Sequence, residues 1–257
     1  MAVLGAAAAA SAYPQIFLTE SKTWVPPQDG NICIHLVGAG GGGVGTSQGN
    51  YGGGGGGYCR KNSLAVTTSG SFTVVVGSGG AGGWSNNDAP DGGDTTMAGT
   101  GLSSTLTAEG GDGGDGSSGG NHGGAGGTAS NGDVNMTGSA GGSAGGCVNV
   151  YTSGRSSSVT DAAGGGLANS GWGEICGGSE VDITHWDNTY IGHPIYSGDL
   201  CGGGFGYGSA NASSSYIMAA NGGIGGGGGG ARQTSYNTYA GGGKGGDGII
   251  IIQYLPW

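Results

Sequence analysis

The residues best suited to chemistry are two histidines and two aspartates that lie close together late in the chain. His185 and His193 flank the stretch HWDNTYIGH, and Asp182 and Asp187 lie beside them. Imidazole and carboxylate groups at this spacing could form a metal site or an acid–base pair. Histidines in a polar loop are more commonly solvated or hydrogen-bonded, and we favour that interpretation. We therefore expect no metal site here.

Other catalytic patterns carry little information in this sequence. Gly38, Gly40 and Gly43 match the dinucleotide-binding spacing GxGxxG directly after NICIHLV, but 71 of the 257 residues are glycine. No amphipathic helix follows the match, as a nucleotide-binding unit requires. Lys244 lacks the Ser or Thr of a phosphate-binding loop, and the serine runs read as linkers or turns and not as a nucleophile elbow.

Paired carboxylates could in principle catalyse glycoside hydrolysis, in which the general acid has a raised pKa. Asp112 and Asp115 are surrounded by glycines, and this setting does not suggest a raised pKa for either group. The sequence therefore predicts a protein that is not an enzyme and that needs no cofactor.

The cysteines indicate neither a zinc site nor a disulfide framework. They are five in number, widely spaced and without a CxxC pair: Cys33, Cys59, Cys147, Cys176 and Cys201. We expect small buried thiols in a protein that folds in a reducing cytoplasm.

Composition and charge exclude several classes of partner. The formal net charge is −10 with only six Lys and Arg residues, which opposes binding to nucleic acid or to anionic membranes. No apolar run approaches the ~20 residues that span a bilayer, so we expect no membrane insertion. Hydrophobic residues make up 35% of the chain, which is too little for a conventional core to explain the whole fold.

Several short segments have the pattern of β-strands. Residues 15–20 and 31–37 alternate or are rich in β-branched side chains, and residues 62–68 and 71–76 read as a hairpin around Ser69-Gly70. The final run IIIIQYLPW, residues 249–257, is typical of a strand buried on both faces.

Glycine tracts separate these strands, and several repeat in triplets such as GGD-GGD and GGK-GGD. A three-residue period matches an extended left-handed helix that has no internal hydrogen bonds. Such helices must bond to neighbours, and the absence of Cβ atoms lets backbones approach closely enough to do so. We favour a bundle of polyglycine-II-like tracts, the alternative being long irregular loops.

The predicted fold class is therefore all-β. It combines a small antiparallel β framework with polyglycine-II-like tracts and long loops, and has essentially no α-helix beyond a short one that the N-terminal segment could form. We expect residues 1–20 to be an attachment segment and residues 21–257 to be a glycine-rich β domain. The start MAVLGAAAAASAY lacks the basic region of a signal peptide, and its side chains for attachment are Val3, Leu4 and Tyr13.

One stretch, residues 172–201, is poor in glycine and rich in aromatic and polar residues. Such side chains on loops suit the recognition of sugars or protein surfaces, because they give a large and rigid contact area. They could equally fill a small core. The candidate receptor-binding residues here and in a later loop are Trp172, Trp186, Tyr190, His193, Tyr196, Tyr236 and Tyr239.

The order of motifs resembles a known family. Val25 and Pro26 precede VGAGGGG at 37–43, TVVVGSGG follows at 73–80, and GGGKGGDGIIIIQY closes the chain at 241–254. This pattern resembles the glycine-rich domain of tailed-bacteriophage fibre and tail-tip proteins. It is more loosely similar to the polyglycine-sandwich adhesins at phage fibre tips.

The resemblance implies a virion protein that is made in the host cytoplasm, attaches to other virion proteins through its N-terminus, and forms a homo-oligomer, usually a trimer. Our first expectation is a non-catalytic adhesin that binds a host surface polysaccharide or outer-membrane protein through its aromatic loops. The second is a capsid or tail structural protein, such as a head fibre, without a receptor role. A secreted ice-binding or matrix protein is the third, which the lack of regular Thr or Ala arrays disfavours.

Overall fold

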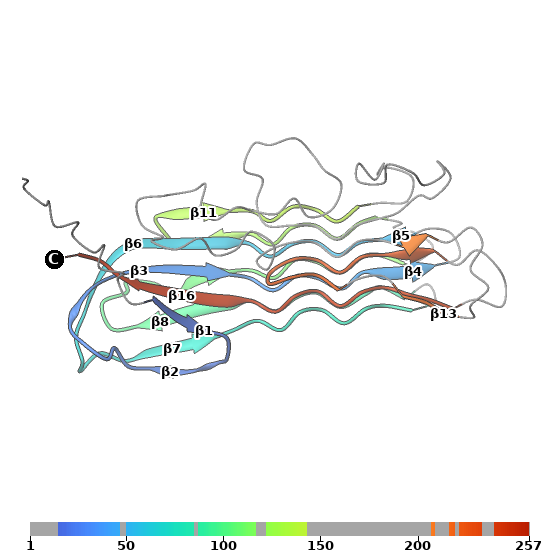
Figure 1. Ribbon diagram of the computed structural model, residues 1–257. Helices are drawn as coiled ribbons and strands as arrows, with labels where there is room; N and C mark the ends of the chain where they lie inside the picture. Colours follow the sequence, from blue (N-terminus) through green and yellow to red (C-terminus); the bar gives the residue numbers. More distant parts are fainter. Residues whose placement is uncertain are drawn as a thin grey trace, which may run out of the picture.

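Two antiparallel five-stranded sheets pack face to face at one end of the molecule (Figure 1). The computed structural model describes residues 15–46, 50–84, 87–116, 122–142, 207–208, 216–218, 221–232 and 239–256. Sheet A has the strand order β1 (Gln15–Leu18), β16 (Ile249–Tyr254), β3 (Gly30–Val37), β6 (Tyr58–Val66) and β11 (Val134–Met136). Sheet B has the order β10 (Ala129–Ser130), β9 (Leu106–Ala108), β8 (Thr95–Gly99), β7 (Phe72–Val75) and β2 (Lys22–Trp24).

The hydrophobic core lies between these sheets. Every second residue of β3 and of β7 points into it, as period-two alternation requires, and the Trp24 and Phe72 rings lie 5.4 Å apart between their centroids. The main buried side chains are Leu18, Trp24, Ile32, Ile34, Leu36, Leu64, Phe72, Val74, Met97, Leu106, Ile250 and Ile252. We call this half of the molecule the sandwich.

The prediction of a doubly buried final strand is confirmed. β16 lies between β1 and β3 in sheet A, and all six of its residues are buried. Its neighbour β3 is likewise buried on both faces from Ile32 onward. The continuous apolar run IIII is therefore explained by a central position in the sheet.

The predicted hairpin over 62–76 is wrong. β6 pairs with β3 and β11 in sheet A, whereas β7 pairs with β2 and β8 in sheet B. Leu64 and Phe72 enter the same core from opposite sheets, so the turn between the strands crosses the end of the sandwich. Local alternation shows which side chains are buried, but not which of two facing sheets a strand joins.

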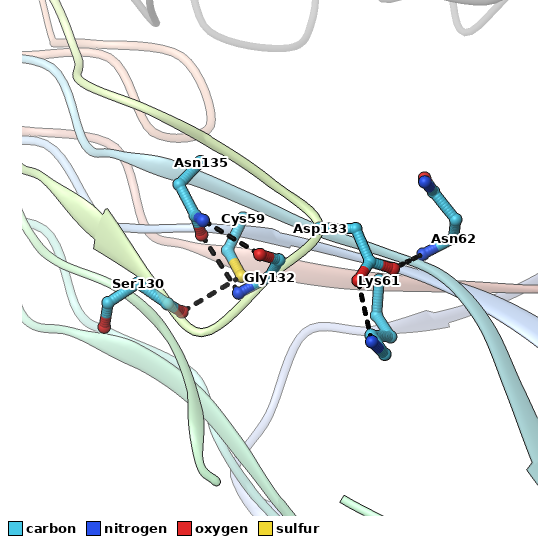
Figure 2. Close-up of polar contacts among 7 residues, drawn as sticks. All are labelled: Cys59, Lys61, Asn62, Ser130, Gly132, Asp133 and Asn135. Atoms are coloured by element: carbon cyan, nitrogen blue, oxygen red, sulfur yellow. Dashed lines mark hydrogen bonds and ion pairs between the residues drawn. The ribbon is translucent and has the colours of Figure 1, made fainter. Parts of the chain in front are cut away.

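Side-chain hydrogen bonds fasten the turn between β10 and β11, where the chain passes from sheet B to sheet A (Figure 2). Asp133 accepts from the Lys61 ammonium at 2.7 Å and from the Asn62 backbone N–H at 2.8 Å, and these bonds lower the pKa of its carboxyl group. The Asn135 amide bonds both backbone groups of Gly132, and the Cys59 thiol donates to the Ser130 carbonyl. The turn therefore closes one side of the sandwich.

Glycine tracts continue the strands of both sheets away from the sandwich (Figure 1). We number them in chain order: tract 1 (38–43), tract 2 (52–57), tract 3 (77–83), tract 4 (88–94), tract 5 (109–116), tract 6 (122–128), tract 7 (137–142), tract 8 (222–230) and tract 9 (242–248). Tracts 9, 1, 2 and 7 prolong the strands of sheet A, and tracts 3, 4, 5 and 6 prolong those of sheet B. Within each set, the tracts lie side by side in the same order as the strands that they prolong.

Tract 1 shows how the tracts are held together. Its six N–H groups donate in turn to tracts 2, 4 and 9, and the same three partners recur three residues later. Its carbonyls accept from tracts 3, 5 and 8, so tract 1 has six neighbours. A bond direction that repeats every three residues is the signature of an extended helix with three residues per turn. The expected polyglycine-II-like bundle is confirmed.

Many inner positions of the bundle leave no room for a side chain, although the small Ala39 of tract 1 is fully buried. A Cβ atom added to Gly40 would lie 2.0 Å from the carbonyl oxygen of Gly226, and one on Gly43 would lie 2.0 Å from that of Gly229. Residues with side chains recur at outward positions, such as Ser78 and Ala81 in tract 3. Tract 8 reverses direction at Gly225, whose φ of 69° favours glycine.

Within the described residues there is no helix that is long and apolar enough to cross a bilayer. The boundary expected at residue 20 falls after β1, which pairs with β16 from Gln15 to Leu18. Part of the expected attachment segment is thus an edge strand of sheet A.

We predict that Gly40→Ala destabilises the protein far more than Ser78→Ala. The new Cβ at position 40 must displace a backbone carbonyl, which we expect to cost about 3 kcal/mol or more. Position 78 faces outward, so its change should stay within about 0.5 kcal/mol. Chemical denaturation of both variants measures this difference. Equal stabilities would contradict the close-packed bundle.

Candidate functional site at the distal end

The path of the chain distinguishes two ends of the molecule. At the sandwich end the described connections are short, for example residues 67–71 and 131–133. At the other end, which we call the distal end, tracts run out into the connections between residues 46 and 50, 84 and 87, 116 and 122, and 142 and 207. The largest insertion in the chain therefore starts from the distal side.

Small β elements close the distal end. A four-stranded sheet has the order β12 (Tyr207–Gly208), β14 (Ala231–Arg232), β4 (Val44–Thr46) and β5 (Asn50–Tyr51), and β13 (Tyr216–Met218) pairs with β15 (Tyr239–Gly241). Figure 1 shows β4, β5 and β13 at the end opposite the sandwich. A second hydrophobic cluster of Val44, Tyr51 and Ala89 lies here.

Most of the aromatic residues predicted to bind a receptor lie outside the described residues. This holds for Trp172, Trp186, Tyr190, His193, Tyr196 and Tyr236, and also for His185, Asp182 and Asp187. Tyr239 begins β15, where its backbone pairs with Tyr216 of β13 at the distal end. The attachment candidates Val3, Leu4 and Tyr13 also lie outside the described residues.

Trp84 is a distal aromatic residue that the sequence analysis missed. Its side chain is 40% exposed, and its backbone forms a bridge with Gly241 of β15. Among the described residues the other large exposed hydrophobic side chains, Phe17, Val25 and Val75, belong to the sandwich. The signal was present in the sequence, because Ser78, Ala81 and Trp84 follow the three-residue spacing of outward positions.

Two outward rows of acidic side chains lie on neighbouring tracts. Tract 4 carries Asp88, Asp91 and Asp94, and tract 5 carries Glu109, Asp112 and Asp115, all at a spacing of three residues. The tract 4 carboxylates accept the N–H groups of Gly116, Gly113 and Gly110 at 3.0, 2.7 and 3.0 Å.

The tract 4 carboxylates serve as acceptors for those N–H groups of tract 5 that have no neighbouring tract to bond with. The N–H groups of tract 5 donate in turn to a carbonyl of tract 6, an aspartate of tract 4 and a carbonyl of tract 1. All eight N–H groups from 109 to 116 are satisfied in this way. The tract 4 row therefore has a structural role at the surface of the bundle.

The expectation of an unperturbed Asp112 is wrong. Burial raises the pKa of its carboxyl group, and the nearby negative charges of Asp91 and Glu109 raise it further. Because the folded state holds this proton more tightly than the unfolded state, the contribution of Asp112 to stability falls as the pH rises from 3.8 through its folded pKa.

A buried polar chain lies in sheet A. The His35 Nδ1 atom is 2.7 Å from the Tyr58 hydroxyl, and its Nε2 atom is 3.4 Å from the Cys33 Sγ atom. Such a thiol–imidazole pair could activate a nucleophile. All three side chains are 2–3% exposed, so none of them is presented to a substrate in this structure.

The second described cysteine is also unsuited to reactivity. Burial raises the pKa of Cys59 to about 11, so its thiol stays protonated near neutral pH. Neither Cys33 nor Cys59 forms a disulfide, and both are buried, as expected from the sequence. Within the described ranges no three His, Cys, Asp or Glu side chains are grouped so that they could hold a metal ion.

The glycines that match a nucleotide-binding spacing have another role. Gly38, Gly40 and Gly43 belong to tract 1, where each donates its N–H to a neighbouring tract. Their backbone groups are thus used within the bundle and are not offered to a phosphate.

A sequence model of a glycine-rich domain matches residues 18–255. The chain belongs to this glycine-rich domain family. The match spans both the sandwich and the bundle, and it begins at the last residue of β1. A search of curated proteins finds no relative that matches the chain.

We predict that Asp91→Ala destabilises the protein by about 1–3 kcal/mol, because the Gly113 N–H loses a charged acceptor. Asp91→Asn keeps an acceptor oxygen and should cost less. Both changes remove a negative charge and should lower the pKa of Asp112, which NMR titration of its carboxyl carbon measures. An unchanged pKa of Asp112 in both variants would contradict the coupling between the two rows.

Proposed function

We propose that this protein is a non-catalytic adhesin of a tailed-bacteriophage virion. It binds the host cell surface through the distal end of its glycine bundle. The observation that carries the proposal is the position of the long connections, whose described borders lie at one end of a hydrogen-bonded scaffold. A rigid scaffold that presents loops at one end is a recurrent arrangement for binding.

The bundle suits this role because it resists deformation. Tract 1 is bonded to six neighbours, and the tract 5 N–H groups are all satisfied. A loop held at both ends by such a scaffold loses less freedom on binding, which preserves affinity. The resemblance to fibre and tail-tip domains supports the location on a virion.

The two ends of the molecule then have different partners. The sandwich end carries β1, and the segment before it, with Val3, Leu4 and Tyr13, attaches to other virion proteins. The distal end contacts a surface polysaccharide or an outer-membrane protein. The protein acts as a homo-oligomer, for which a trimer is the expected form in fibres.

Binding of the purified full-length protein to intact bacterial cells tests the proposal. We expect saturable binding to some cells in a diverse panel, because receptors differ between hosts. Changing Trp172, Trp186, Tyr190 and Tyr196 together to alanine should weaken it by about tenfold or more. The matched control changes Val25 and Val75 to alanine, since both are exposed in the sandwich.

The control should bind as the unchanged protein does. If the variant with the four alanine changes binds with full affinity, or both variants lose binding equally, these four aromatic residues do not form the contact surface. Failure of the unchanged protein to bind any cell of the panel would favour a structural role in the capsid or tail.

A further inference from the structure

Hydrogen bonds to three other segments of the chain hold the backbone of Gly83 and Trp84 at the distal end of tract 3. The preceding Gly83 donates to the Gly43 carbonyl and accepts from the Gly242 N–H at 2.8 and 3.0 Å. Trp84 itself pairs with Gly241, and its carbonyl accepts from the backbone N–H and the side-chain amide of Asn87, both at 3.3 Å. The position of this residue is therefore set by the bundle.

The Trp84 side chain is partly exposed to solvent, although its backbone is held in place. It is 40% exposed, and the outward positions that precede it in tract 3 carry only Ser78 and Ala81. A large aromatic ring on a fixed backbone loses little freedom on binding, and tryptophan is enriched among residues that dominate interfaces. Burial in the core explains Trp24, but it does not explain an indole that is exposed at a tip.

The surrounding charge indicates which ligands this tip can accept. The next tract begins with the carboxylates of Asp88 and Asp91, and the chain as a whole carries a net charge of −10. The one cation of the adjoining tract 9, Lys244, is paired with Asp247 at 2.9 Å. An acidic ligand would meet repulsion here, whereas a neutral ligand would not.

We propose that Trp84 and Asn87 form a contact site for a neutral saccharide. The indole stacks on the apolar C–H face of a sugar ring, and the Asn87 amide, which has a second N–H and an oxygen to offer, bonds hydroxyl groups. This inference rests on the proposed adhesin function and names its ligand class. It assigns part of the contact to the bundle itself rather than to residues 172–201.

An array of immobilised oligosaccharides tests the site with the full-length protein. The probes are neutral hexose oligosaccharides and oligosaccharides that contain uronic acids. We expect binding to neutral probes that Trp84→Ala weakens by about tenfold or more and Trp84→Phe weakens less, because Phe retains a stacking ring. Val75→Ala removes an exposed apolar side chain from the sandwich and should leave binding unchanged.

Unchanged binding by Trp84→Ala would overturn the site, as would preferential binding to the acidic probes. Thermal unfolding separates a lost contact from a lost fold, since Trp84→Ala should unfold within about 2 °C of the unchanged protein. Cell binding by the unchanged protein without any saccharide binding would overturn the ligand class and leave the adhesin function standing. Binding to neither cells nor saccharides would overturn both.

Discussion

Backbone-to-backbone hydrogen bonding in three directions is the constraint on which the rest of this structure depends. Each inner tract must reach several neighbours at once, and every third residue serves the same neighbour. A carbonyl oxygen stands 2.0 Å from the place of a Cβ atom at Gly40, so only glycine satisfies the geometry. The entropic penalty of ordering glycine is offset by bonds that are shared across the whole bundle.

The sandwich and the bundle hold their two layers together in different ways. In the sandwich, two sheets are separated by large side chains such as Phe72 and Met97. In the bundle, the same layers continue without side chains between them, and the layers bond directly. Most side chains of the tracts then lie in outward rows, and the aspartates of tract 4 complete the hydrogen bonding of tract 5 at the surface of the bundle.

Much of this could be predicted from the sequence. The triplet spacing predicts the bundle, and the apolar run 249–252 predicts a central strand, because both patterns are local. The sheet to which β7 belongs could not be predicted, since alternation is identical in either sheet. The raised pKa of Asp112 could not be predicted because it depends first on burial and then on the charges of Asp91 and Glu109, and tract packing produces both. Trp84 is predictable in principle, because it takes the next position in the row of Ser78 and Ala81.

The outward rows also show where a chain so rich in glycine can place side chains that contact other molecules. Inner positions such as Gly40 and Gly43 leave no room even for a Cβ atom, because a backbone carbonyl already lies there. Chemical variety is confined to rows on its surface and to the connections at its ends. At the sandwich end the connections are turns that close the core. In the function that we propose, recognition is therefore left to the distal end, where Trp84 is exposed and the long insertion begins.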